Sequence, residues 1–456
     1  MVSARHRDRP PGRARVGTSR SRSPALVPAD ARALGPRARR GAHASHGVRR
    51  LHLWLIAFAA IAPRLVVLLH ERAAILTSFT DKSDDFALTF VHHGTFGLVP
   101  GEPSAYTQPL YGFFLVPIYW IFGREWWSVG FAQILVATAT AFLVYAIGAR
   151  VLSRAAGTFA AVVATLNPYL VWHDVHLNRE VLDQLVAAAL VLCVLVAADR
   201  RSVPWAIAAG IYGGLAILGN VRLALVPVVV ALYLVFRTGW TWAPLALVAA
   251  SALTVAPWVV RNRVELGCFA LTTDGRALWK ANNLQTYGLL SHGKWIDDVR
   301  DPPGHPFPNP EEARVIYQRG DGKYHVDECA NESYYQHRAW LFVREHPGAK
   351  AKLAGLAVRM EWDPRTTASA TDSGHGAIRR WAQPVYTSLL YALGLLGVLF
   401  APRRLSVLAL ALLAYQTFAA VVFVGATRYR IPTDFLIALL AAAVFERVLP
   451  RRLRAP

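Results

Sequence analysis

The chain has 456 residues, of which 54% are hydrophobic, with a mean hydropathy of +0.31 and a formal net charge of +20 at pH 7. Soluble domains are about 45–50% apolar, so this composition excludes an ordinary soluble protein and indicates an all-α polytopic membrane protein. Much of the positive charge lies in the N-terminal arm and in short loops, which favours a topology signal and lipid contact over nucleic-acid binding.

The N-terminal arm, residues 1–47, is rich in Arg, Pro, Ser, Gly and Ala and shows no apolar periodicity. Such a segment cannot bury enough apolar surface to fold, so we predict a disordered basic cytoplasmic arm. The first apolar run begins near residue 51 and is long enough to remain as a membrane span. We therefore expect no cleaved signal peptide.

Ten apolar runs are long enough to cross a hydrocarbon layer of about 30 Å. They lie near residues 51–70, 126–149, 155–173, 181–198, 203–219, 222–237, 240–259, 384–401, 405–424 and 431–448. An eleventh stretch, 109–123, is shorter and contains Pro109 and Pro117, which remove backbone donors and bend a helix.

The side of the membrane that each loop faces is predicted from its Lys and Arg residues, which accumulate in short cytoplasmic loops. The basic loops contain Arg49 and Arg50, Arg150 and Arg154, Arg200 and Arg201, Arg237, and Arg403 and Arg404. Together with the basic C-terminal tail, they place both termini in the cytoplasm. The number of crossings is then even, so we expect ten spans and an outer-face juxtamembrane or re-entrant helix at 109–123.

This topology divides the chain into a transmembrane module at 48–260, an extracytoplasmic segment at 261–383, and a second transmembrane module with a basic tail at 384–456. The first module contains an outer loop, 71–125. The high Arg and low Lys content of the whole chain is typical of a bacterial GC-rich genome, so we predict a multi-pass protein of a bacterial cell membrane.

The extracytoplasmic segment contains about half of the acidic residues and reads as a small domain. Its stretch 301–310 is rich in Gly and Pro and predicts an irregular loop, while apolar periodicity predicts two membrane-surface helices that meet at Pro347. Cys268 and Cys329 both lie in this segment, where oxidation is permitted. The sequence leaves open whether they form a disulfide.

Three acidic residues, Asp81, Asp84 and Asp85, lie within five positions of the outer loop. Ser83 is a plausible N-cap, which would put Asp84 in the first turn of a helix. Acids at this position can act as general bases or simply complement the helix dipole. Asp84 is our first candidate for a catalytic base, and Asp81 competes with it.

Five arginines are exceptions to the charge rule because they lie at the outer ends of spans. They are Arg222, Arg261, Arg263, Arg428 and Arg430. A guanidinium offers paired donors and keeps its charge, which suits a phosphate, although a single Arg could merely snorkel to lipid headgroups. Three separate sites on one face favour a shared anion.

Outer acids and outer arginines together predict glycosyl transfer from a lipid-linked donor. A carboxylate would accept the proton of an acceptor hydroxyl while arginines stabilise the phosphate leaving group. Base and phosphate would lie on opposite faces of the sugar, as in inverting sugar hydrolysis. No cofactor is expected and no zinc-type cluster is present, although the acids could instead hold a divalent metal ion.

Several motifs in this order resemble the GT-C integral-membrane glycosyltransferases that use polyprenyl-phosphate sugars, which include protein O-mannosyltransferases and lipid A aminoarabinose transferases. The motifs are Arg64, the acidic outer loop, PSAYTQPLYGFFLVPIYWIFG at 103–123, LNREVL at 177–182, APWVVRN at 256–262 and TRYRIP at 427–432. The resemblance covers most of 51–448. It implies a GT-C bundle, a polyprenyl-phosphate sugar donor, and an acceptor that is left open among protein, glycan and lipid.

The resemblance also implies roles for individual residues: an outer-loop Asp as the base, arginines on the donor phosphate, and Glu180 as a second acid near a substrate. This chain has Asp84–Asp85 where relatives often have Asp-Glu, and Gln108 where some have Lys. Phosphate binding would then depend more on arginine. Tyr106, Tyr111 and Tyr429 complete the substrate-binding candidates, with interfacial anchoring as the alternative for each tyrosine.

Two other classes of protein remain as alternatives. A secondary transporter would place acids or broken helices near the middle of the membrane, and few are visible in this chain. A noncatalytic membrane scaffold would use the outer segment to bind partners. Replacing Asp84 and Asp81 separately would distinguish a scaffold from an enzyme.

Overall fold

The computed structural model describes residues 36–78, 80–302, 310–320, 326–365 and 381–450. The chain divides into two units, Met1–Arg50 and Leu51–Pro456. The first unit contributes only the beginning of a helix that starts at Pro36, so the disorder predicted up to residue 47 is wrong at its C-terminal end. Ala and Arg are strong helix formers, and extending an existing helix costs little. Residues 1–35 of the predicted arm lie outside the described residues.

Regular structure in the described residues is helical. The helices are α1 (Pro36–His70), α2 (Ser83–His93), α3 (Pro109–Phe122), α4 (Trp126–Val151), α5 (Arg154–Thr165), α6 (Pro168–His173), α7 (Glu180–Arg200), α8 (Val203–Gly219), η1 (Val221–Leu223), α9 (Val226–Thr238), α10 (Trp242–Leu266), α11 (Gly275–Lys280), α12 (Thr286–Ser291), η2 (Ile296–Asp298), α13 (Pro310–Gln318), α14 (Glu328–Glu345), α15 (Pro347–Trp362), α16 (Gln383–Val398), α17 (Arg403–Val422), α18 (Thr427–Arg430), η4 (Ile431–Thr433) and α19 (Asp434–Val448).

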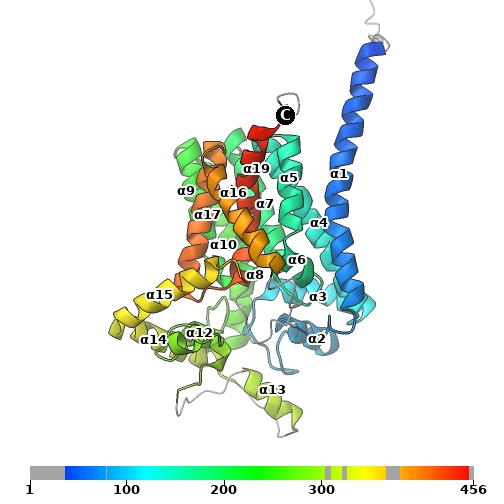
Figure 1. Ribbon diagram of the computed structural model, residues 1–456. Helices are drawn as coiled ribbons and strands as arrows, with labels where there is room; N and C mark the ends of the chain where they lie inside the picture. The colour runs from blue at the N-terminus through cyan, green and yellow to red at the C-terminus, as the bar shows by residue number, and fades with distance from the viewer. Residues whose placement is uncertain (1–35, 79, 303–309, 321–325, 366–380, 451–456) are drawn as a thin grey trace, which may run out of the picture. The chain divides into compact units, whose positions relative to one another are not determined.

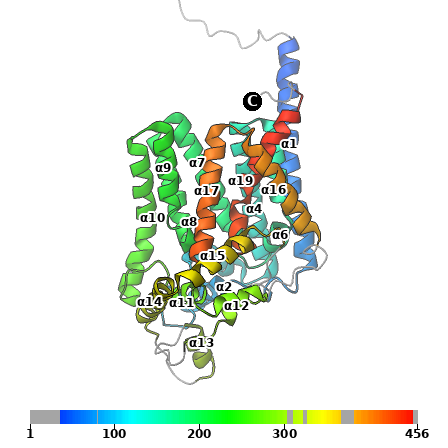
Figure 2. The ribbon, with the colours of Figure 1, turned by 60° about the vertical axis from the view of Figure 1, so that its left-hand side comes forward.

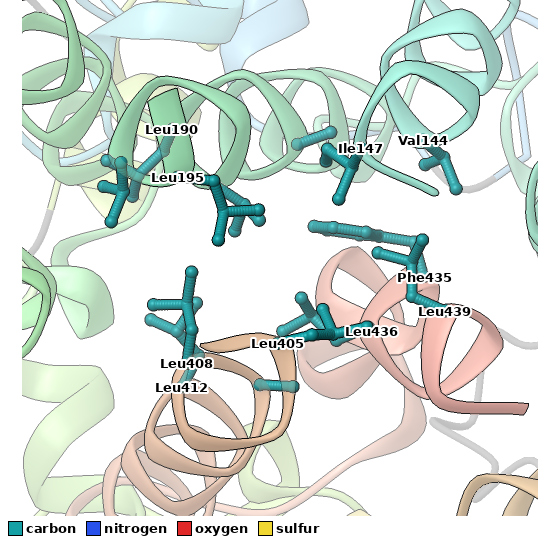
Figure 3. Close-up of a cluster of buried hydrophobic side chains, with 14 of the residues drawn as sticks. Val144, Ile147, Leu190, Leu195, Leu405, Leu408, Leu412, Phe435, Leu436 and Leu439 are labelled. Carbon is teal, nitrogen blue, oxygen red and sulfur yellow. The ribbon is translucent and has the colours of Figure 1, made fainter. Parts of the chain in front are cut away.

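The second unit is built around a helix bundle. Helices α4, α7, α8, α9, α10, α17 and α19 run side by side, while α2 and α11 to α14 lie beyond one end of them (Figures 1 and 2). Helix α7 is apolar on all sides and is the most buried of the long helices, as expected for a central helix. Leu190 and Leu195 of α7 face Leu408 of α17, with Phe435 of α19 and Ile147 of α4 completing the core (Figure 3).

Small residues let neighbouring helices approach closely. A Cβ at Gly148 of α4 would lie 2.5 Å from the Cα of Gly157 in α5. A Cβ at Gly397 of α16 would lie 1.9 Å from the carbonyl oxygen of Leu440 in α19. Without a hydrophobic force between helices in lipid, such close backbone packing is a main source of association.

Six helices among the described residues are long and apolar enough to cross a membrane, which makes this a multi-pass membrane protein. Each of the ten predicted runs contains a helix, but the count of ten spans is not confirmed. Helices α8 and α16 are shorter, and the run 155–173 is divided into α5 and α6. Asn167 caps the start of α6 and Pro168 is its first residue, so the backbone restarts there.

The layer beyond the bundle contains the segments predicted to lie outside. Helix α3 coincides with the predicted helix at 109–123, and α14 and α15 meet at Pro347 as predicted. Of the predicted irregular loop 301–310, residues 303–309 lie outside the described residues. The position of these helices at a membrane surface stays a prediction.

Cys268 and Cys329 form a disulfide, with a Cα–Cα distance of 6.0 Å, which answers the question that the sequence left open. The bond joins the chain just after α10 to the first turn of α14. It closes a loop with a sequence separation of 61, which contains α11, α12 and α13. Cys193, in contrast, is buried in α7 as a free thiol.

We expect the double substitution Cys268→Ser/Cys329→Ser to destabilise the segment between α10 and α16 by about 2–5 kcal/mol, because it releases a long closed loop in the unfolded chain. Thermal denaturation in detergent, followed by limited proteolysis, would measure this effect. Reductant should lower the midpoint of the wild-type protein and leave that of the double variant unchanged. Equal midpoints for the two proteins without reductant would contradict a stabilising role.

Candidate functional site

A cavity of about 520 Å³, lined by charged and polar side chains as well as apolar ones, lies where the layer beyond the bundle meets the bundle. Its wall comes from segments far apart in the sequence: 80–82 before α2, 106–108 before α3, 177–179 before α7, 220–222 after α8, 272–281 around α11, and 423–429 between α17 and α18. The wall includes six sequence-predicted residues, Asp81, Tyr106, Gln108, Arg222, Arg428 and Tyr429.

Asp81 is the aspartate of the outer loop that lines this cavity. Its backbone N–H donates to the carbonyl oxygen of Leu177 at 3.0 Å, which fixes the loop against the segment before α7. Its Oδ1 accepts hydrogen bonds from the backbone N–H and the Oγ of Ser83, at 3.0 and 2.7 Å. Ser83 is therefore the first residue of α2 and not its N-cap, which corrects the sequence interpretation.

The charge of Asp81 is set by its neighbours. Burial alone would raise the pKa of its carboxyl group, but Arg179, the hydrogen bonds from Ser83, and Arg428 together outweigh burial and hold the pKa below its usual value. Asp81 is therefore ionised at neutral pH and able to accept a proton.

Three arginines give the cavity wall its positive charge. Arg428 donates from Nε to Glu180 at 2.7 Å. Arg179 donates to the side-chain oxygen of Gln108, while its Nε is buried without a partner among the described residues. An unsatisfied buried donor is rare in folded proteins, so it marks a place where an acceptor belongs.

Arg222 shows the same feature more clearly. Its guanidinium lies 3.7 Å from the ring centroid of Tyr429 and donates to the carbonyl oxygen of Val424 at 2.6 Å. It is only 7% exposed, and its Nε also has no partner in the described part of the chain. A phosphate, with several acceptor oxygens, fits two such donors better than a neutral ligand does.

Glu180 is buried behind the cavity wall. Its Oε1 accepts the hydrogen bond from Arg428, and its Oε2 has no partner among the described residues. Its contact with Arg428 makes it a group that positions an arginine of the cavity. Tyr111 lies away from the cavity in the core, where its hydroxyl donates to Gln133 at 2.6 Å.

The structure does not bring Asp84 or Asp85 into the cavity. Asp84 is 3% exposed and accepts hydrogen bonds from the hydroxyl of Tyr119 at 2.6 Å and from Arg124 at 2.6 and 3.0 Å. Asp85 forms an ion pair with Arg314 of α13. Both carboxylates are held by cations of the protein, so they act as structural links of α2.

Three of the predicted arginines also lie elsewhere. Arg430 is fully buried and pairs with Asp434 at 3.0 Å. Arg263 is exposed and donates to the carbonyl oxygen of Gly267. Arg261 donates to backbone carbonyls of the outer loop and faces a second, mostly apolar cavity of about 780 Å³ between α3, α8 and α10.

The sequence prediction missed two cations of the site, Lys82 and Arg179. The ammonium of Lys82 lies 4.0 Å from the ring centroid of Tyr106 and 3.0 Å from Glu311 of α13. Arg179 could have been found, because it is another arginine at the predicted outer end of a span. Acidic and aromatic residues of the opposite wall were missed as well, among them Glu332, whose pKa burial raises to about 7.

Within the described residues, no three His, Cys, Asp or Glu side chains come together in a way that could hold a metal ion.

Comparison with known proteins gives a family-model match over part of the chain and a shared fold. Residues 103–260 match the family model described as dolichyl-phosphate-mannose-protein mannosyltransferase. This segment includes Tyr106, Gln108, Arg179 and Arg222 of the cavity wall. No curated protein sequence matches the chain.

Solved structures of low sequence identity share the fold. The archaeal oligosaccharyltransferase AglB from Archaeoglobus fulgidus, in complex with an inhibitory peptide and a dolichol-phosphate, has a TM-score of 0.52 at 14% identity, covering 88% of this chain and 50% of that chain. The apo form of that archaeal enzyme has a TM-score of 0.50 at 13% sequence identity, covering 87% of this chain and 51% of that chain. ArnT from Cupriavidus metallidurans bound to undecaprenyl phosphate has a TM-score of 0.41 at 16% sequence identity, covering 85% of this chain and 77% of that chain.

Most of this chain shares the fold of the archaeal oligosaccharyltransferase, and residues 103–260 match the mannosyltransferase family model. Both findings agree with the resemblance to GT-C glycosyltransferases predicted from the sequence. The chain spans about half the length of the archaeal oligosaccharyltransferase. Its reaction and substrates are therefore argued from its own cavity.

We expect Asp84→Asn to destabilise the protein by about 1–3 kcal/mol, because the buried hydrogen-bond donors of Tyr119 and Arg124 lose a charged acceptor. The apparent melting temperature of the purified protein in detergent would show this loss. Asp81→Asn is the matched control on the same loop and should leave the melting temperature nearly unchanged. The reverse order of the two melting temperatures would contradict a structural role for Asp84.

Proposed function

We propose that this chain transfers a sugar from a polyprenyl-phosphate donor to a hydroxyl group of an acceptor, with inversion at the anomeric carbon. One observation carries the proposal. An ionised carboxylate, Asp81, shares a cavity at the end of an apolar helix bundle with Arg179 and Arg222, whose buried Nε–H groups have no acceptor among the residues that the structure describes.

The donor phosphate would bind to the cationic wall. Nε of Arg179 and Nε of Arg222 would donate to phosphate oxygens, and Arg428 would add charge while Glu180 holds it in place. The cation–π contact with the ring of Tyr429, 3.7 Å from the guanidinium carbon, would help to hold Arg222 in place. The isoprenoid chain would extend along the apolar surface of the bundle into lipid.

Asp81 would act as the general base. As the acceptor oxygen attacks the anomeric carbon, its proton passes to the carboxylate, and the bond between that carbon and the phosphate oxygen breaks. The bonding electrons go to the phosphate, where the arginines stabilise the added charge. The protonated Asp81 then releases its proton to water.

The proposal refines the assignment made from sequence. Asp81 takes the role for which Asp84 was the first candidate, and Arg179 joins Arg222 and Arg428 in place of Arg261, Arg263 and Arg430. Tyr106 and Gln108 remain in the substrate-binding wall. Protein, glycan and lipid acceptors all satisfy the requirement for a hydroxyl group.

Support for a lipid-phosphate donor comes from the description of the matching family, which names dolichyl-phosphate-mannose, and from the dolichol-phosphate in the archaeal complex of the same fold. Both facts concern other proteins. They agree with the two buried arginine donors of this cavity, Nε of Arg179 and Nε of Arg222, which suit an anionic ligand.

We also propose that the cavity faces the extracytoplasmic side of a bacterial cell membrane, with both termini in the cytoplasm. At the other end of the bundle, Asp199 forms ion pairs with Arg150, Arg237 and Arg404 from three different helices. Arginines concentrated at the end away from the cavity agree with the positive-inside rule.

The catalytic proposal is tested by measuring the rate of sugar transfer. We expect Asp81→Asn to lower transfer by about 10²–10⁴-fold without loss of stability, because the general base is removed. Arg222→Gln should weaken donor binding through the lost charge-assisted hydrogen bonds. Purified protein in lipid, with a panel of polyprenyl-phosphate sugars, would be assayed for sugar transfer and donor hydrolysis.

Arg263→Gln is the control for the loss of an arginine, because Arg263 is exposed and lies outside the cavity wall. Full transfer by Asp81→Asn would overturn the proposal. Movement of the lipid-linked sugar across the bilayer without covalent change would instead indicate a transporter, and an unchanged cellular phenotype of Asp81→Asn would indicate a scaffold.

Labelling in intact cells tests the orientation. The native cysteines are either buried or in a disulfide, so a single introduced cysteine gives a clean signal. A membrane-impermeant maleimide should label Glu345→Cys, at the last residue of α14, in intact cells, and should label Arg200→Cys only after lysis. The opposite pattern would reverse the assigned sides.

A further inference from the structure

The two oxygens of the Asp81 carboxylate have different surroundings. Both hydrogen bonds from Ser83 end on Oδ1, one from the backbone N–H at 3.0 Å and one from the hydroxyl at 2.7 Å. A carboxylate that accepts two hydrogen bonds on one oxygen cannot rotate without breaking both. Oδ2 is therefore the oxygen left for a proton from a ligand in the cavity.

The hydroxyl of Ser83 is itself held in one orientation. Ser83 is 1% exposed, and its Oγ lies 3.4 Å from Oγ1 of Thr107, which lines the cavity and is 4% exposed. Ser83 has one hydroxyl hydrogen, and an ionised carboxylate can only accept. The Ser83 hydrogen must therefore point to Asp81, and Thr107 must donate to Ser83.

We propose that Ser83 is the positioning residue of the catalytic base: its hydroxyl, oriented by Thr107, fixes Oδ1 of Asp81 so that Oδ2 alone receives the proton. This inference rests on the proposed function of Asp81. It concerns a buried hydroxyl that touches neither the donor nor the acceptor.

The other groups that face Asp81 stay unchanged when Ser83 is altered, which makes the effect of its hydroxyl measurable. They come from every element around the carboxylate: Lys82 before α2, Tyr111 of α3, Arg179 before α7, Glu180 and Asp183 of α7, and Arg428 of α18. Arg179 and Arg428 keep favouring the ionised form. Removing the hydroxyl removes one charge-assisted hydrogen bond to that form, so the carboxyl becomes a weaker acid.

The decisive experiment compares the pH dependence of kcat/KM for wild type, Ser83→Ala and Ser83→Thr. The base must be ionised, so activity falls as pH drops through the pKa of Asp81. We expect the acidic limb of Ser83→Ala to move up by about one pH unit, with a lower kcat and an unchanged KM for the donor. Ser83→Thr retains the hydroxyl and should restore the wild-type limb.

Thr89→Ala is the matched control, because Thr89 is another hydroxyl residue of α2 and bonds only to the backbone oxygen of Asp85 at 3.0 Å. Its acidic limb should coincide with that of the wild type. Coincident limbs for wild type and Ser83→Ala would overturn the role of Ser83, whereas the proposed function of Asp81 would stand if Asp81→Asn remained inactive.

A second readout does not depend on turnover. Apolar carbodiimides react with protonated carboxyl groups, so the pH at which the peptide containing Asp81 becomes labelled reports its protonation by mass spectrometry. This pH should rise in Ser83→Ala and stay at the wild-type value in Thr89→Ala. An unchanged labelling pH in Ser83→Ala would contradict the inference even if the chain had no transferase activity.

Discussion

An arginine buried at the end of an apolar bundle must find acceptors for its N–H groups, and this constraint decides where an anion can bind. Arg430 finds its acceptors in the protein, because Asp434 lies one turn further along the chain. Arg222 donates to Val424 and stacks on Tyr429, yet its buried Nε has no partner in the described residues. The cavity is thus defined by cations that the protein satisfies only in part.

The fold was largely predictable because apolar length is a local property of the sequence. Each predicted run contains a helix, and α7 is the central helix that an all-round apolar pattern indicates. The errors also have local causes. Apolar length alone predicts one span over 155–173, but Asn167–Pro168 within this run is a helix-start signal. Composition alone predicts a disordered arm up to residue 47, but Ala and Arg favour the helix that begins at Pro36.

The sequence predicts that aspartates and arginines form the site, but it does not predict which of them line the cavity. Asp84 and Asp81 have the same chemistry, and the difference arises because Tyr119 and Arg124, which lie 35 and 40 positions further along the chain, fold back onto Asp84. No sequence pattern near residue 84 predicts these two contacts. Arg179 was missed for a simpler reason, since the rule that selected Arg222 applies equally to an arginine that directly precedes a span.

The bond between Cys268 and Cys329 bears on the order of biosynthesis. Disulfides form and persist mainly in oxidising compartments, so in the proposed orientation the loop that this bond closes would mature after translocation. Both cysteines leave the ribosome before α16, α17 and α18, and α18 carries Arg428. The disulfide between Cys268 and Cys329 can therefore form while Arg428 is still being synthesised. The later helices α16 to α19 would then insert next to a part of the cavity wall that has already folded.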